Sequence, residues 1–192
     1  MKNKLALGIS VITVVPMVAL LTIMSIYLID FSFYNKQEFW VIWSIVFLVI
    51  VPSSAYAIKY LVPKFRTKGR TWERNLAFVT GVTGQVLGFL GTLYLQAPQG
   101  VKALFMVYLV AGILLSVTNF IIGKKASGHA CGVSGPITLI TFVFGFKAGL
   151  VFLVMPLVFW SRLKLKRHDI SELLLGTVIG ITATIISFLH VG

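Results

Sequence analysis

Charged residues are scarce in this chain, and acidic residues are the scarcest. Only 11% of the 192 residues are charged, and Asp and Glu together number five. Soluble domains carry roughly 25% charged residues, so this composition excludes a soluble globular domain. One cysteine, Cys131, excludes an internal disulfide, and its place in an apolar run indicates a small packing residue. No Ser/Pro/Gly-rich linker interrupts the chain, so we expect one domain over residues 1–192.

Long apolar runs take the place of the missing charges, and 58% of the residues are hydrophobic. A helix needs roughly 20 apolar residues to cross a bilayer, and an open sheet edge cannot be satisfied there. The runs therefore predict an all-α, polytopic transmembrane helix bundle of about six or seven spans. The predicted spans are 5–29, 39–62, 75–95, 101–122, 129–146, 148–160 and 170–190. The first run is longer than a signal-peptide core, so we expect it to be retained.

The basic residues are distributed unevenly between the predicted loops. With seven alternating crossings, 14 of the 17 fall on one side. They are Lys2, Lys4, Lys59, Lys64, Arg66, Lys68, Arg70, Arg74, Lys124, Lys125, Arg162, Lys164, Lys166 and Arg167. The positive-inside rule predicts a multi-pass cell-membrane protein with this side in the cytoplasm. No aromatic-basic surface accompanies these cations, so we expect the bilayer and no nucleic acid as a partner; nothing specifies an oligomeric state.

Small residues recur at helical spacing inside the apolar runs. The groups are Gly84, Gly88 and Gly91, then Gly132 and Gly135, then Gly176 and Gly180. No phosphate-binding fingerprint surrounds them, so they predict close packing between helices.

A first polar cluster, "KKASGHACGVSGP", opens the predicted span at 129–146. Ser127, Gly128 and the first backbone N–H groups of that helix would present donors at the positive end of its dipole. His129 lies among them, and topology alone does not require a histidine. This cluster predicts an anion site.

A second polar cluster, "SRLKLKRHDISELLLG", precedes the last predicted span. His168 and Glu172 are four residues apart, so on a helix the carboxylate can hold one imidazole nitrogen and leave the other as a base or nucleophile. The same residues fit a capping box in which Asp169 is the N-cap and Glu172 reaches back. The spacing leaves both interpretations open. Arg162 adds a planar guanidinium group, whose paired N–H donors suit phosphate oxygens.

Two histidines and a carboxylate also raise the question of a metal site. The chain has no His-Glu-x-x-His pattern and no carboxylate cluster, and its many cations would repel a dication. We therefore expect no metal and no cofactor, and a polyanionic ligand instead.

These two clusters resemble, in order, the second and third signatures of the type 2 phosphatidic acid phosphatase superfamily. The family pattern is (Pro)-Ser-Gly-His followed by Ser-Arg-x5-His-x3-Asp, and this chain has Ser127 to His129 and then Ser161 to Glu172. Ala126 stands where the proline is usual, and Glu172 replaces the aspartate. The resemblance covers a motif-bearing core of about 59–192 and implies a phosphatase-like core for the bundle.

The first family signature, Lys-x6-Arg-Pro, is degenerate here. Lys59 and Arg66 have its spacing, but no proline follows Arg66. Some small prokaryotic members carry an Arg-rich loop before the third span and a Lys-x-Ser-x-His version of the second signature, which Lys125, Ser127 and His129 match. By this resemblance the first-loop phosphate ligands would be Lys64, Arg70 and Arg74.

The resemblance implies an integral membrane phosphatase that needs no metal. Its substrate would be phosphatidic acid, phosphatidylglycerophosphate or an isoprenoid (di)phosphate. His168 would attack phosphorus, oriented by Glu172, and form a phosphohistidine, while His129 would protonate the leaving oxygen. Arg162, Ser127, Gly128 and Lys125 would hold the phosphate together with the first-loop cations. A phosphoryl or headgroup transferase, or a non-catalytic protein that binds or transports anionic lipids, remains an alternative.

Overall fold

The computed structural model describes residues 2–191, and within this range it is helical with no strand. The elements in chain order are α1 (Lys2–Ile12), α2 (Val15–Ile29), η1 (Phe31–Tyr34), α3 (Glu38–Ile45), η2 (Val46–Ile50), α4 (Val51–Leu61), α5 (Pro63–Arg66), α6 (Arg70–Tyr94), α7 (Gln99–Ser116), η3 (Val117–Ile121), α8 (Gly128–Phe144), η4 (Phe146–Val154), α9 (Met155–Lys164) and α10 (Ile170–Val191). The all-α prediction is confirmed.

Five helices in the described part of the chain are long and apolar enough to cross a membrane. They are Glu38–Leu61, Trp72–Tyr94, Gln99–Ile121, Phe146–Lys164 and Ile170–Val191. The first joins α3 to α4 through the π-helical turn η2, and the fourth joins η4 to α9. Counting α1 and α2 as one bent span gives six, and α8 is apolar but has only 17 residues. The helices indicate a membrane protein, while the predicted count of seven is not established.

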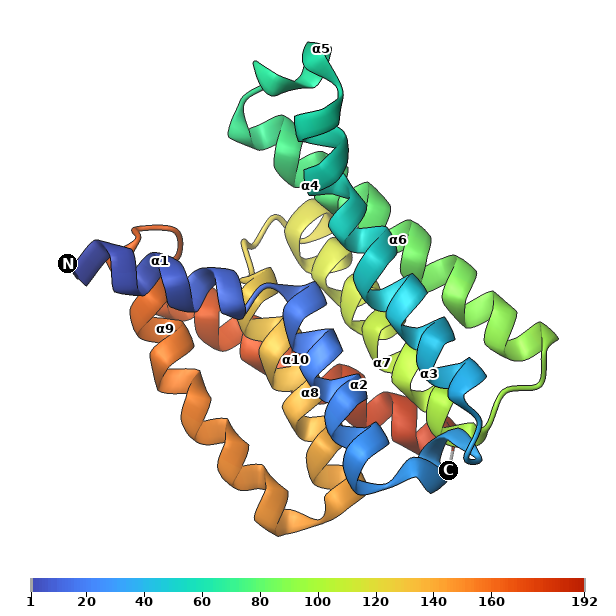
Figure 1. Cartoon of the computed structure of the whole chain (residues 1–192). Coiled ribbons are helices and arrows are strands. Elements are labelled where there is room, and N and C mark those ends of the chain that lie inside the picture. Colours follow the sequence, from blue (N-terminus) through green and yellow to red (C-terminus); the bar gives the residue numbers. More distant parts are fainter. Residues whose placement is uncertain (1, 192) are drawn as a thin grey trace.

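The first predicted span, 5–29, is not one continuous helix in the structure. It is bent by 55° between Asn3–Ile12 and Val15–Ile29. Pro16, in the first turn of α2, has no N–H for the carbonyl of Ile12, and its ring would collide with that carbonyl in a continuous helix. As a result α1 lies across one end of the bundle at an angle to α2 (Figure 1).

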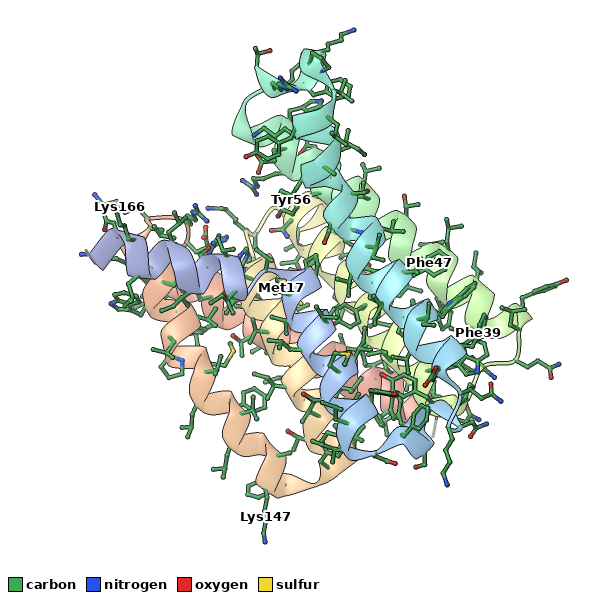
Figure 2. All side chains as sticks on the ribbon, in the orientation of Figure 1. Met17, Phe39, Phe47, Tyr56, Lys147 and Lys166 are labelled. Carbon is green, nitrogen blue, oxygen red and sulfur yellow. The ribbon has the colours of Figure 1, made fainter. Side chains whose placement is uncertain are left out.

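The connections between helices gather at two opposite ends of the bundle. Figure 1 shows α1, α5 and the α7–α8 and α9–α10 links at one end, and the α2–α3, α6–α7 and α8–α9 links at the other. The labelled Lys166 and Lys147 lie at these opposite ends (Figure 2). This arrangement groups the loops as the charge analysis expected, and it brings the two histidine clusters to the same end.

Glycines allow several helices to pack at close range. A Cβ atom on Gly180 of α10 would lie 2.6 Å from the carbonyl oxygen of Cys131 in α8, and one on Gly176 would overlap the backbone of Ser127. The indole of Trp43 donates a hydrogen bond to the carbonyl of Gly88 at 3.2 Å and fills the space beside Gly91. The predicted small-residue packing is confirmed at these positions.

Large apolar side chains cover the outer surface of the bundle. Leu28, Ile121, Leu150 and Leu189 each expose 70% or more of their area. Contiguous apolar surface of this kind is unfavourable in water and is satisfied by lipid chains. The side chains therefore support the membrane assignment made from helix length.

Candidate functional site

The N-terminal turns of α8 and α10 are joined at the end of the bundle that carries the polar clusters. Ser127 is the N-cap of α8, and its hydroxyl accepts a bond from the Ala130 N–H at 3.4 Å. The N–H of Ser127 donates to the backbone carbonyl of Glu172 at 2.9 Å. Gly128 is the first residue of α8, and His129 follows it. The two family-like signatures are thus side by side.

The carboxylate of Glu172 performs both roles that the sequence left open. His168 Nδ1 lies 2.7 Å from Glu172 Oε2, and the N–H of Asp169 donates to the same oxygen at 3.3 Å. The N–H of Glu172 donates in turn to Asp169 Oδ1 at 2.8 Å, which completes the capping box. Because a carboxylate accepts, Nδ1 carries the proton and Nε2 keeps its lone pair.

The surroundings of His168 favour its neutral form. Burial of the ring lowers the pKa of His168 below its usual 6.5, and the charges of Arg162 and Lys125 act in the same direction. The bond to Glu172 raises the pKa but does not cancel these effects. At neutral pH the ring is therefore uncharged, the state in which Nε2 can act as a nucleophile.

Lys125 is held against the same carboxylate. Its Nζ lies 3.0 Å from Glu172 Oε1, and its side chain remains more than half exposed. An ammonium group has three donors, so the pair with Glu172 leaves donors for an anion in the adjoining hollow.

Ser10 of α1 connects the other site residues, and the sequence analysis missed it. Arg162 Nη1 donates to Ser10 Oγ at 2.8 Å, and Arg167 Nη1 donates to the same oxygen at 3.1 Å. His129 Nε2 lies 3.3 Å from the backbone carbonyl of Ser10. Ser161 donates its hydroxyl to the carbonyl of Ala6 at 3.0 Å and so fixes α1 on α9. Only the isolated polarity of Ser10 in an apolar run marks this position.

A hollow of about 450 Å³ opens beside His168. Its lining residues are Lys125, Leu163, Lys166, Arg167, His168, Asp169 and Glu172. Three of these side chains are cationic, so the hollow suits an anion. Among the described residues, no three His, Cys, Asp or Glu side chains are grouped to hold a metal ion.

The structure does not bring the predicted first-loop cations to this hollow. Lys64 and Arg74 are exposed on the α4–α6 hairpin, whose tip α5 projects beyond the rest of the bundle (Figure 1). Arg66 Nε donates to the carbonyl of Tyr60 at 2.8 Å, and Lys59 and Glu73 form an ion pair. The side chain of Arg70 lies outside the part of the chain that the structure describes.

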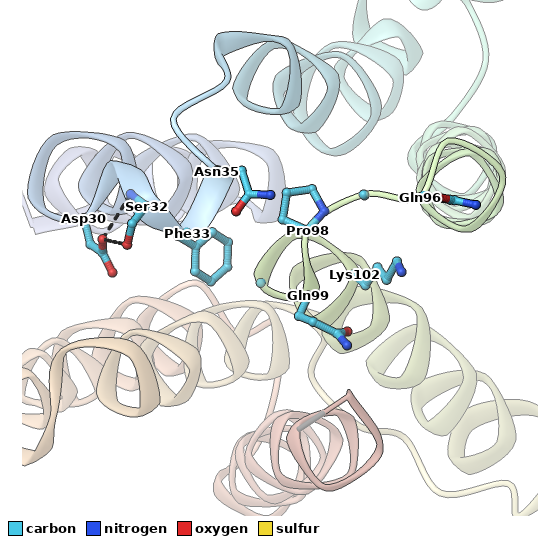
Figure 3. Close-up of a pocket in the computed structure, with 10 residues that line it drawn as sticks. Asp30, Ser32, Phe33, Asn35, Gln96, Pro98, Gln99 and Lys102 are labelled. Atoms are coloured by element: carbon cyan, nitrogen blue, oxygen red, sulfur yellow. Dashed lines mark hydrogen bonds between the residues drawn. The ribbon is translucent and has the colours of Figure 1, made fainter.

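A second hollow, of about 510 Å³, lies at the opposite end of the bundle between the α2–α3 and α6–α7 links (Figure 3). Its carboxylate, Asp30, accepts from the N–H of Ser32 at 3.1 Å and from the Ser32 hydroxyl. No histidine or cysteine lines it. The two histidines that lie beside arginine and lysine side chains, His129 and His168, are at the other end of the bundle.

Comparison with family models, with curated proteins and with solved structures found no significant match.

Proposed function

We propose that the chain is a membrane phosphatase that hydrolyses a lipid phosphate or diphosphate through a phosphohistidine intermediate. The observation that carries this proposal is the 2.7 Å contact between His168 and Glu172 at the edge of a cation-lined hollow. This contact orients a neutral imidazole with its free nitrogen available for attack, next to the N-terminus of a helix that bears a second histidine.

In the first step, Nε2 of His168 forms a bond to phosphorus and the bond from phosphorus to the lipid oxygen breaks. A bound phosphate dianion favours the protonated form of His129, which then gives a proton to the leaving oxygen. In the second step, neutral His129 takes a proton from water while the water oxygen attacks phosphorus. The P–N bond breaks, and inorganic phosphate and the original His168 are released.

The surroundings supply the charge stabilisation that phosphoryl transfer requires. Arg162, Lys125 and the N–H groups at the start of α8, including that of Gly128, provide donors for the equatorial oxygens. Ser127 caps the same turn. Phosphoryl transfer depends mainly on positioning and on electrostatic stabilisation, so this set of groups supports catalysis without a bound metal.

The location of the hollow favours a lipid substrate. It lies between the ends of two apolar helices, Phe146–Lys164 and Ile170–Val191, so a lipid phosphate in it would reach His168 while the hydrocarbon chain stays beside the helices. Phosphatidic acid, phosphatidylglycerophosphate and isoprenoid (di)phosphates all have this form. By the positive-inside rule we place the site at the cytoplasmic leaflet of the cell membrane.

The test is phosphate release from a panel of these lipids by the purified chain in detergent. We expect His168→Ala to reduce the rate by at least roughly 10³-fold, because the nucleophile is removed. His190→Ala is the matched control, since His190 is the exposed histidine in the last turn of α10. Brief incubation with labelled substrate should also leave an acid-labile, base-stable label on the wild-type chain. Equal activity of His168→Ala and His190→Ala would refute the proposal, as would lipid binding without phosphate release.

A further inference from the structure

Two guanidinium groups meet at one oxygen atom in this protein. Arg162 and Arg167 both donate through Nη1 to Ser10 Oγ, at 2.8 Å and 3.1 Å. Like charges repel at this range, and more strongly in partly buried surroundings, where Arg162 is only 5% exposed. A phosphate oxygen at the same point would accept from both guanidinium groups and would bring negative charge, which a hydroxyl does not.

The turn between α9 and His168 fixes the backbone positions of the two arginines relative to each other. The N–H of Arg167 donates to the carbonyl of Arg162 at 3.0 Å, and the N–H of Lys166 donates to the carbonyl of Leu163 at 2.9 Å. Lys166 has a φ of 51°, in the left-handed region. These features form a Schellman motif, in which the residues at both ends of the turn are tied together. The convergence of the guanidinium groups is therefore built into the backbone that leads to His168.

The proposed catalytic histidines border the same point. His129 lies 3.3 Å from the carbonyl of Ser10, and Arg167 immediately precedes His168 and lines its hollow. Ser10 itself is only 2% exposed. Ser10, whose hydroxyl lies between the guanidinium groups of Arg162 and Arg167, is thus enclosed by the side chains assigned to phosphoryl transfer.

We propose that Arg167 is a second phosphate-binding residue of this site, and that the Ser10 hydroxyl holds the position of a phosphate oxygen until a ligand binds. Rotation of Ser10 about its Cα–Cβ bond would remove its hydroxyl from between the two Nη1 atoms without moving α1. Arg167, which lines the hollow, and Arg162 beside it would then supply the paired positive charge that Lys64 and Arg74, on the α4–α6 hairpin, do not bring there. The inference rests on the proposed function for the class of ligand, a phosphate group.

The first experiment measures binding of radiolabelled inorganic phosphate to the purified full chain in detergent at constant ionic strength. We expect Arg167→Gln to weaken binding roughly 10- to 100-fold, because a charge-assisted bond is lost. Arg167→Lys should recover only part of the affinity, since an ammonium cannot reproduce the planar fork. If Arg167→Gln does not fold, Arg167→Lys still tests whether phosphate binding needs the planar guanidinium group. Lys164→Gln is the control: it removes the same charge from an exposed position outside the hollow, and we expect a change below about twofold.

The second experiment asks whether Ser10 holds the place of the ligand. Ser10→Ala removes a competitor for the arginines, so phosphate should bind several-fold more tightly. Weaker binding to Ser10→Ala would overturn this role. Equal phosphate affinities of Arg167→Gln and Lys164→Gln would overturn the role of Arg167, and so would a wild-type chain that binds no phosphate.

A third measurement separates this inference from the proposed function and identifies the source of the phosphate. If hydrolysis depends on His168 but the affinity for phosphate is unchanged in Arg167→Gln, only the inference about Arg167 fails. If phosphate binding depends on Arg167 but no lipid is hydrolysed, only the proposed function fails. A parallel increase in KM of Arg167→Gln for short-chain phosphatidic acid supports a lipid headgroup as the ligand, and an effect confined to inorganic phosphate supports the released product.

Discussion

Replacing Gly176 with alanine tests whether the contact between α8 and α10 positions the site. A Cβ atom there would overlap the carbonyl oxygen of Ser127 and lie 3.1 Å from its C and N atoms. Ordinary carbon–oxygen contact is about 3.5 Å, so α10 must move away from the start of α8 by roughly 1 Å. These are backbone atoms and cannot rotate aside. Overpacking of this kind costs about 1–3 kcal/mol.

The same movement would disturb the proposed chemistry. The bond from the N–H of Ser127 to the carbonyl of Glu172 links the two histidine clusters, and it would be stretched. A displacement of about 1 Å can reduce a rate roughly 10²-fold. We therefore expect Gly176→Ala to lose both stability and phosphatase activity.

The assay compares thermal unfolding in detergent, followed by circular dichroism, with phosphate release by the same samples. A loss of 1–3 kcal/mol corresponds to a decrease of about 3–10 °C in Tm for a chain of this size. Gly81→Ala is the matched control, because this mid-helix glycine of α6 has no atom within 4 Å of the added Cβ. Its Tm should stay unchanged or rise by up to about 4 °C, because alanine is favoured over glycine within a helix by roughly 0.5–1 kcal/mol. If Gly176→Ala behaves like Gly81→Ala in both assays, the inferred close contact is wrong.

Two further predictions concern the turn and the carboxylate beside His168. Activity should fall as the pH drops through a midpoint below 6.5, because protonation of His168 removes its lone pair and its pKa is lowered. Glu172→Gln should reduce the rate by roughly 10²-fold. It should also move this acid limb to lower pH, because the carboxylate raises the pKa of His168; a kcat/KM profile whose limb moves upward would contradict the reasoning. Lys166→Gly should stabilise the protein by about 1 kcal/mol, since glycine adopts the left-handed φ of 51° without strain, and an unchanged or lower Tm would count against this account of the turn.

The local features of the site could be predicted from sequence because a helix determines them. His168 and Glu172 are four residues apart at the start of α10, and that spacing brings their side chains together whatever the rest of the fold does. The capping box of Asp169 follows from the same local geometry. What the spacing could not show is that one carboxylate serves both partners.

The long-range features could not be predicted. Ser10 meets His129 and Arg162 across 119 and 152 positions of sequence, and no pattern in an apolar run indicates which polar residue makes such contacts. The first-loop cations were chosen by resemblance to an Arg-rich loop, and that resemblance does not reveal that α5 projects from the bundle (Figure 1). Pro16 was visible in the sequence, but its effect depends on the helix into which the chain continues.

The docking of α1 has a consequence for how the protein is made. Ser10 contacts residues 129, 162 and 167, which come 119 to 157 positions later in the sequence. The ribosome therefore synthesises α1 long before these partners exist. During most of translation the contacts that fix Ser10 cannot form, and they are complete only when Phe146–Lys164 and the turn that carries Arg167 have been synthesised. A chain that ends before Arg162 carries neither arginine that donates to Ser10, so α1 would lack these contacts.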